Sequence, residues 1–326
     1  MLIRLIKFSG YLLYTLVVLL FLLWYKFPTD PLKSRIENDL NMMTPSLQWV
    51  VEEIALLPSF NVQLRNISIT EKKEKKVLLV VKTMNLRPDL LSWKKTGTIA
   101  AKYTLDLLGG TVVGRLALAK DRSALEYDGV MREIKIDSKA LAFIQQEYQR
   151  TVRGILSGNF SGVRQLQKST HPKSTHTLQG KFTFAKGEIG LQQPVMGMAQ
   201  LNFDSIETEL NFANGTISLS KGKITSPIFA ASFKGNLYTA VPCRLSRIRM
   251  TGSFQPGPKF TASVNSPSLV HMLKKGIQKV GLPFTVNGLL HEPGIVFTSL
   301  PPAFNRQMGL QKKLRRQSPK LPKRSR

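Results

Sequence analysis

Side chains able to carry out chemistry are few in this chain of 326 residues. It contains one cysteine, Cys243, and four histidines, His171, His176, His271 and His291. A single thiol cannot form an internal disulfide, and the histidines lack the spacing of a metal-binding motif. Two of them lie in residues 167–176, a polar stretch typical of a loop. The sequence therefore predicts no catalytic, cofactor or metal site.

Two short motifs resemble those of penicillin-binding proteins. Ser220–Lys223 matches the SxxK pattern, and Lys95–Gly97 matches KTG. Their order in the chain is reversed, the SDN motif is missing, and Ser220 follows a predicted β-hairpin instead of starting a helix. A nucleophilic serine needs a base held beside it in fixed geometry. We interpret both motifs as chance matches and predict that the protein is not an enzyme.

The charge of the chain is strongly positive, with 47 Lys and Arg against 20 Asp and Glu, a formal net charge of +27. The stretch from Leu210 to His291 contains neither Asp nor Glu. Such an excess favours an anionic partner, and the candidates are nucleic acid, lipid headgroups and an acidic protein, although exposed charge can also simply be solvated. The sequence shows no nucleic-acid-binding motif, so a nucleic-acid partner is not expected.

An uncharged apolar segment, residues 8–25, lies near the N-terminus. It reaches the length of about 17–25 residues that a helix needs to span a bilayer. Arg4 and Lys7 precede it, and Trp24 and Tyr25 end it, as aromatic residues do at a membrane interface. No cleavage pattern of small residues follows, which favours an uncleaved anchor over a signal peptide. Basic residues on both sides leave the orientation open on charge alone.

The anchor suggests a division of the whole chain. We predict a cytoplasmic N-terminus (1–7), a transmembrane anchor (8–25), a juxtamembrane helix (26–45), a β-rich periplasmic domain (46–300) and a basic disordered tail (301–326). The short helix is predicted because Asp30 is a good N-cap, and Leu32 and Ile36 follow it on one helical face.

Most of the chain after the short helix alternates polar and apolar residues in short runs. Val62–Ile69 and Val77–Val81 flank a charged turn and predict a hairpin, as does Asn214–Gly215. Later runs contain a glycine, such as Gly180 and Gly252, which is typical of bulges that bend a sheet. We predict a mainly β fold, an elongated, curved antiparallel sheet with a few short helices.

Six segments occur along the chain in a recognisable order. They are Phe27–Leu32, which fits F-P-x-[DE]-x-L, then Leu57–Pro58, Leu86–Ser92, Gly109–Gly114, Gly187–Leu191 and Leu282–Gly288. In this order and spacing the chain resembles the type II secretion system protein N (GspN) family. The resemblance extends from Leu12 to about Phe297.

The resemblance implies a non-enzymatic accessory component of the type II protein secretion system in the bacterial inner membrane, with one span and a periplasmic body. The implied partners are secretion subunits and the membrane, with anionic lipid as a further candidate. The family also resembles AsmA-like envelope proteins, whose curved sheet forms a lipid groove, and lipid binding or transport is the alternative function. The candidate groove lining is Ile217, Leu219, Ile224 and Phe233, and the sequence leaves open whether these residues are core instead.

Overall fold

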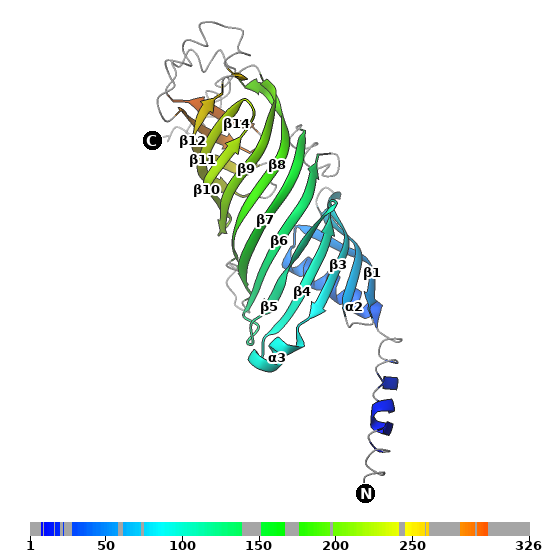
Figure 1. Ribbon diagram of the computed structural model, residues 1–326. Helices are drawn as coiled ribbons and strands as arrows, with labels where there is room; N and C mark the ends of the chain where they lie inside the picture. Colours follow the sequence, from blue (N-terminus) through cyan, green and yellow to red (C-terminus); the bar gives the residue numbers. More distant parts are fainter. Residues whose placement is uncertain are drawn as a thin grey trace, which may run out of the picture. The chain divides into compact units, whose positions relative to one another are not determined.

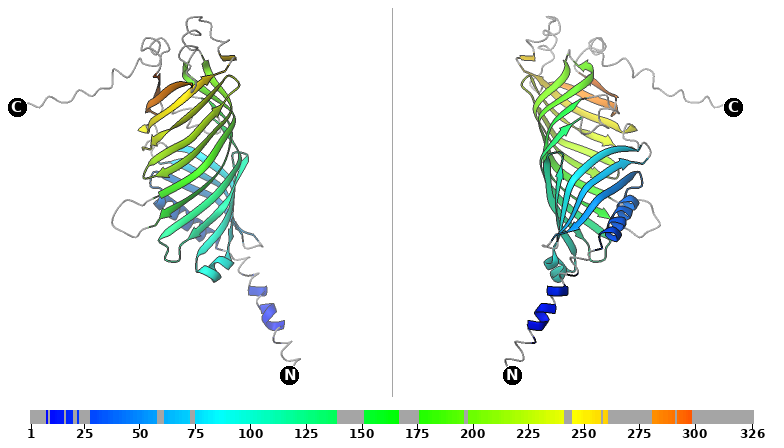
Figure 2. Two further views of the ribbon diagram at one scale, coloured as in Figure 1. Left: turned by 60° about the vertical axis from the view of Figure 1, so that its left-hand side comes forward. Right: turned by 90° about the vertical axis from the view of Figure 1, so that its right-hand side faces the viewer.

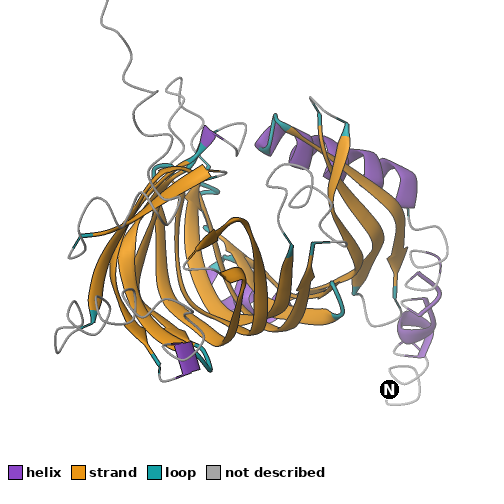
Figure 3. Ribbon diagram, turned by 90° about the horizontal axis from the view of Figure 1, so that it is seen from above, coloured by secondary structure: helices purple, strands orange, loops and turns teal. Residues whose placement is uncertain are grey.

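The computed structural model describes residues 28–57, 61–72, 75–138, 151–166, 176–195, 198–240, 245–257, 259–260, 281–290 and 292–298, and part of 8–22. Strands make up most of the described chain (Figure 3). They form one antiparallel sheet of 14 strands, in which each strand pairs with its neighbours in the chain, from β1 to β14 (Figure 1). The predicted mainly β fold is confirmed.

The N-terminal segment is described only in part. Its described residues are helical, and their apolar side chains are exposed, among them Phe8, Tyr11 and Leu12. Among the residues that the structure describes, no helix combines the length and apolar character needed to cross a membrane. Much of the predicted anchor (8–25) and all of the predicted tail (301–326) lie outside the described residues.

Two compact units divide the chain, Met1–Leu107 and Leu108–Arg326. The elements of the first unit are α2 (Thr29–Met43), β1 (Leu47–Leu56), β2 (Val62–Glu71), β3 (Lys76–Pro88), α3 (Leu90–Thr96) and β4 (Ile99–Leu107). β2 and β3 pair in antiparallel register, so the hairpin predicted around the charged turn is confirmed.

α2 lies within the segment predicted as a short helix, but it begins earlier than expected. The N–H of Leu32 donates to the carbonyl of Pro28 at 3.3 Å, which makes Pro28 the N-cap residue. Asp30 therefore lies in the first turn and is not the cap, although a carboxylate there still favours the helix dipole. Leu32 and Ile36 pack against a buried cluster formed by Val51, Ile54, Leu64, Ile67 and Val81.

β1 lies at an edge of the sheet, and α2 packs against it (Figure 2). Glu37 Oε1 accepts a hydrogen bond from the Val51 N–H at 2.7 Å. Asn41 Oδ1 accepts one from the Trp49 N–H at 2.9 Å, and its Nδ2 donates to the Trp49 carbonyl at 3.5 Å. An open edge strand offers such unpaired groups to other chains. Side chains of α2 thus satisfy backbone groups that a further strand would otherwise bind.

Replacing Glu37 with alanine should lower the free energy of unfolding by about 1–2 kcal/mol, because a buried N–H is left without an acceptor. Val51, which carries that N–H, is fully buried. Urea denaturation of the full chain in mild detergent measures the change. Glu37→Gln keeps an acceptor oxygen and is the matched control, with less than half the loss expected. Equal losses in the two variants would contradict the backbone role of Glu37.

Ten strands are described in the second unit. They are β5 (Gly110–Leu118), β6 (Ala124–Asp137), β7 (Val152–Gln165), β8 (His176–Val195), β9 (Met198–Ala213), β10 (Thr216–Thr225), β11 (Phe229–Tyr238), β12 (Arg247–Pro256), β13 (Leu282–Leu289) and β14 (Glu292–Phe297). Asn214 and Gly215, with φ of 49° and 76°, form the two-residue turn between β9 and β10. Positive φ at both central residues fits a hairpin turn of the primed class, so this predicted hairpin is confirmed.

An aromatic cluster forms the buried core of the second unit. Phe254 lies at its centre, with its ring centroid 5.1 Å from that of Phe229, 5.5 Å from Phe260 and 6.0 Å from Phe297. Leu282, which is fully buried, completes the contact between β12 and β13. Tilted and edge-on contacts of this kind stabilise aromatic pairs beyond the burial of their area. The cluster joins β11 to β14 on one face of the sheet.

Candidate functional site

The strand register of the second unit arranges side chains in rows, because residues opposite each other in an antiparallel pair point to the same face. One row consists of Leu116, Tyr127, Gly162, Leu178, Phe212, Ile217, Leu237, Ile248 and Gly288. The next row on that face consists of Gly114, Gly129, Phe160, Gly180, Leu210, Leu219, Gly235, Met250 and Val286. Both rows contain only glycine and apolar or aromatic residues, and we call this side of the second unit the apolar face.

All four residues of the candidate groove lining lie on the apolar face. Ile217 and Leu219 belong to the two rows, Ile224 lies opposite Ala231, and Phe233 lies opposite Gly222. Each of the four side chains is half-buried. Ile224 also packs against the aromatic core cluster, so for this residue the core interpretation holds as well. The structure therefore brings the four together on one face and leaves their role as a lining a prediction.

Aromatic rings on the apolar face lie over glycines of neighbouring strands. A Cβ atom on Gly222 would come within 2.5 Å of the Phe233 ring, and one on Gly252 within 2.5 Å of the Phe284 ring. A side chain at either glycine would lift the ring away from the sheet. The glycines thus allow large rings to pack directly over the backbone of the neighbouring strand. The apolar side chains of this face can therefore form a continuous surface.

Some of the glycines lie at bulges and others do not. Gly180 and Gly252 lie in uninterrupted ladders, whereas Gly158 and Gly235 each pair with a residue that borders a register shift. The residues within these two shifts include Glu133 in β6 and Lys221 in β10, whose φ values are 53° and 50°. The sequence gives no signal for these positions, because neither residue type favours a positive φ. A bulge changes which side chains reach which face, so these two positions help to set the faces of the sheet.

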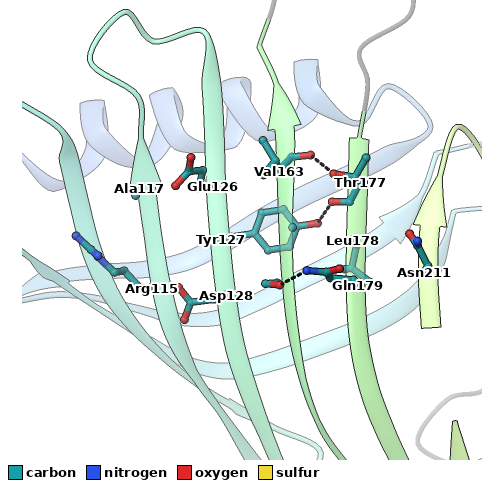
Figure 4. Close-up of a pocket in the computed structure, with 12 residues that line it drawn as sticks. Arg115, Ala117, Glu126, Tyr127, Asp128, Val163, Thr177, Leu178, Gln179 and Asn211 are labelled. Atoms are coloured by element: carbon teal, nitrogen blue, oxygen red, sulfur yellow. Dashed lines mark hydrogen bonds between the residues drawn. The ribbon is translucent and has the colours of Figure 1, made fainter. Parts of the chain in front are cut away.

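The opposite side of the second unit is mainly polar, although Val113, Val130 and Tyr238 are exposed on it. One row on it consists of Arg115, Asp128, Ser161, Gln179, Asn211, Ser218, Asn236, Arg249 and Asn287. Figure 4 shows the part of this row, from Arg115 to Asn211, that lines a shallow hollow. There Gln179 Nε2 donates to Ser161 Oγ at 3.4 Å. We call this side the polar face, and the sequence did not predict its continuity because the pairing register was unknown.

One titratable pair lies at the margin of the apolar face. His176 starts β8, so it lies in a strand and not in the loop predicted for residues 167–176. Its Nε2 lies 2.5 Å from Tyr127 Oη, and its ring centroid lies 5.1 Å from that of Phe212. Burial, and to a lesser extent the Arg164 charge, lower the pKa of the His176 imidazole, and burial raises the pKa of the Tyr127 hydroxyl. The contacts tie β6, β8 and β9 together and favour a neutral histidine.

A neutral His176 makes stability depend on pH in a defined direction. The pKa of its imidazole in the folded chain lies below the ordinary value of 6.5, so the unfolded chain binds more protons near pH 6. Stability should therefore fall as pH drops below about 6.5, until the folded pKa is passed. Thermal denaturation between about pH 7.5 and about pH 5 measures this loss. The variant His176→Phe should show a smaller loss than the natural chain; identical pH profiles would contradict the role of His176.

Charged residues on the polar face form a small ion network. Glu209 pairs with Lys181 at 3.4 Å and with Lys221 at 3.0 Å. The hydrogen bond from Lys221 is the main reason why the pKa of the Glu209 carboxyl is lowered. Among the described residues, no group of three His, Cys, Asp or Glu side chains lies close enough to hold a metal ion.

Comparisons of the chain with models of protein families, with curated proteins and with solved structures found no match. The function must therefore be argued from the geometry of the chain, a sheet with one apolar face and one polar face.

Proposed function

We propose that this chain is a non-enzymatic accessory component of the type II secretion system, anchored in the bacterial inner membrane with its β-rich body in the periplasm. Two features support the membrane location: the uncharged segment at residues 8–25, and the exposed apolar side chains of its described residues. The secretion role is supported by the ordered segments that resemble the GspN family. The observation that carries the proposal is a two-faced sheet joined to an apolar leader, which suits contact with other envelope components.

Two measurements in the source bacterium test this proposal. Deleting the gene should reduce the amount of type II substrates in the medium, and crosslinking of the tagged full chain should recover the secretin or the inner-membrane platform. A periplasmic reporter fused to the C-terminus should be active. A normal set of secreted proteins after deletion would contradict the secretion role, and an inactive reporter would contradict the location.

A lipid-handling role is a second candidate, favoured by the apolar face. Its two apolar rows cross nine strands of the second unit, with rings held flat over glycines. Such a surface suits acyl chains, because apolar surface gains free energy when it leaves water, about 25 cal/mol per Å². This role is compatible with a place in the secretion system. A curved groove, as in AsmA-like proteins, belongs to this proposal.

The lipid proposal has a matched pair of variants on β10. Leu219 lies on the apolar face, and Ser218, its neighbour in the chain, lies on the polar face. Leu219→Glu should reduce the lipid that copurifies with the detergent-extracted chain, as measured by mass spectrometry. Ser218→Glu adds the same charge and should leave the lipid content unchanged. No copurified lipid in the natural chain, or equal losses in both variants, would contradict the lipid role.

A further inference from the structure

The polar face contains a run of strands without any carboxylate. β10 to β13 all fall within the stretch from Leu210 to His291, which has neither Asp nor Glu. The polar face of these four strands therefore carries cations but no negatively charged side chain. The nearest acidic residues on adjoining strands are Glu207 and Glu209 on β9 and Glu292 on β14. Glu209 is already engaged by two lysines.

Three cations form what we call the basic patch: Lys234 on β11, and Arg247 and Arg249 on β12. All three side chains are exposed, and within the described residues none of them has an ion-pair partner. Arg249 lies opposite Asn236 on one side and Asn287 on the other. Lys234 lies diagonally from Arg249, at a typical distance of about 7–8 Å for such positions.

The chemistry of the basic patch fits phosphate groups. A guanidinium offers a fork of donors that matches phosphate oxygens, and the amides beside Arg249 can donate further hydrogen bonds. Like-charged neighbours also repel one another in water, so an anion placed between them relieves that repulsion. The absence of carboxylates across the four strands leaves an anion without a competing charge there.

The surroundings of Arg247 favour a membrane surface over a free anion. Tyr238 lies directly opposite Arg247 and is 44% exposed, and Leu289 lies on its other side. Exposed tyrosine beside arginine is typical of the interface between water and lipid. Two hollows of the polar face are lined by residues of β5 to β10, whereas the three cations of the basic patch are exposed on β11 and β12, where several phosphates of a surface can reach them.

We propose that the basic patch docks the second unit onto the phosphate headgroups of an anionic lipid surface. This inference rests on the proposed membrane location, but its test does not, since the membrane is supplied in the assay. The docking would leave the apolar face, on the other side of the sheet, free for its own partner.

The test uses the full chain inserted through its leader into nanodiscs of neutral phosphatidylcholine, so that the leader is already occupied. Flotation measures its binding to added vesicles, either of phosphatidylcholine alone or with phosphatidylglycerol at about one part in three. The double variant Lys234→Gln/Arg249→Gln should bind the anionic vesicles about 30-fold more weakly, since each basic residue near such a surface adds about fivefold. Added salt should weaken the binding of the natural chain.

The matched control removes the same charge elsewhere. Lys82 and Lys102 are exposed residues of the first unit, and the variant Lys82→Gln/Lys102→Gln should bind within about threefold of the natural chain, because those lysines lie outside the basic patch. Equal losses in both variants, or equal binding to neutral vesicles, would overturn the proposal. Displacement by millimolar inorganic phosphate would reassign the patch to a single small anion, and preferential displacement by poly-glutamate to an acidic protein; either result would also overturn it.

Discussion

Replacing Phe254 with alanine is expected to lower the free energy of unfolding by about 3–5 kcal/mol, the range for large-to-small changes in a packed core. Phe254 contacts three other aromatic rings of the core cluster, on β11, on β14 and at Phe260. Its removal leaves a cavity that rings fixed on separate strands cannot fill without moving the sheet. Urea denaturation of the full chain in mild detergent measures the loss.

An aromatic residue outside the core provides the control for Phe254. Tyr238 is 44% exposed at the end of β11, on the polar face. Tyr238→Ala should therefore cost less than about 1 kcal/mol. If the two variants unfold at the same urea concentration, the cluster around Phe254 is not the core of the second unit.

Replacing Gly252 with valine should cost about 3 kcal/mol, because the new Cβ meets atoms that cannot move away cheaply. It would contact the backbone carbonyl of Ser232 and lie within 2.5 Å of the Phe284 ring. Overpacking of this kind forces shifts of backbone and rotamers. The change should appear in urea denaturation and as a shift in the near-UV signal of the aromatic residues.

Thr251→Val is the matched control for Gly252→Val. Thr251 is the preceding residue on β12, its exposed side chain lies on the polar face, and valine has nearly the same shape. We expect its effect to stay within about 0.5 kcal/mol. A valine at Gly252 that is tolerated equally well would mean that the Phe284 ring does not lie over that glycine.

The sequence predicted the fold class well, because the signals for strands and hairpins are local. Alternation of polar and apolar residues marks a strand wherever one face is buried, and Asn214–Gly215 adopts the turn that its residue types favour. The predicted N-cap of α2 was wrong by two residues. The carbonyl of Pro28 accepts the first helical hydrogen bond, so Pro28 is the cap and Asp30 lies inside the helix.

The two faces of the sheet were harder to predict, because a face depends on register across many strands. A shift of one residue moves a whole set of side chains to the opposite side, and two of the shifts lie at Glu133 and Lys221, whose residue types do not favour a bulge. Gly252 was misread as a bulge for a related reason. Its role is to admit the Phe284 ring from the next strand, and that neighbour cannot be known before the pairing is. The four candidate lining residues lie on one face, but alternation along β10 alone would not give this. The shift at Lys221 is what returns Ile224 to the side of Ile217 and Leu219.

The covering of β1 by α2 has a consequence for how the chain is made. Strand order equals chain order throughout, so each newly emerging strand finds its partner in the segment synthesised just before it. α2 precedes β1, and its Glu37 and Asn41 are therefore available as soon as the first strand appears. We expect a nascent chain to expose a single growing edge at every stage of its synthesis. With only one edge open, two unfinished copies have fewer ways to pair with each other, which is the usual hazard for a large sheet assembled during synthesis.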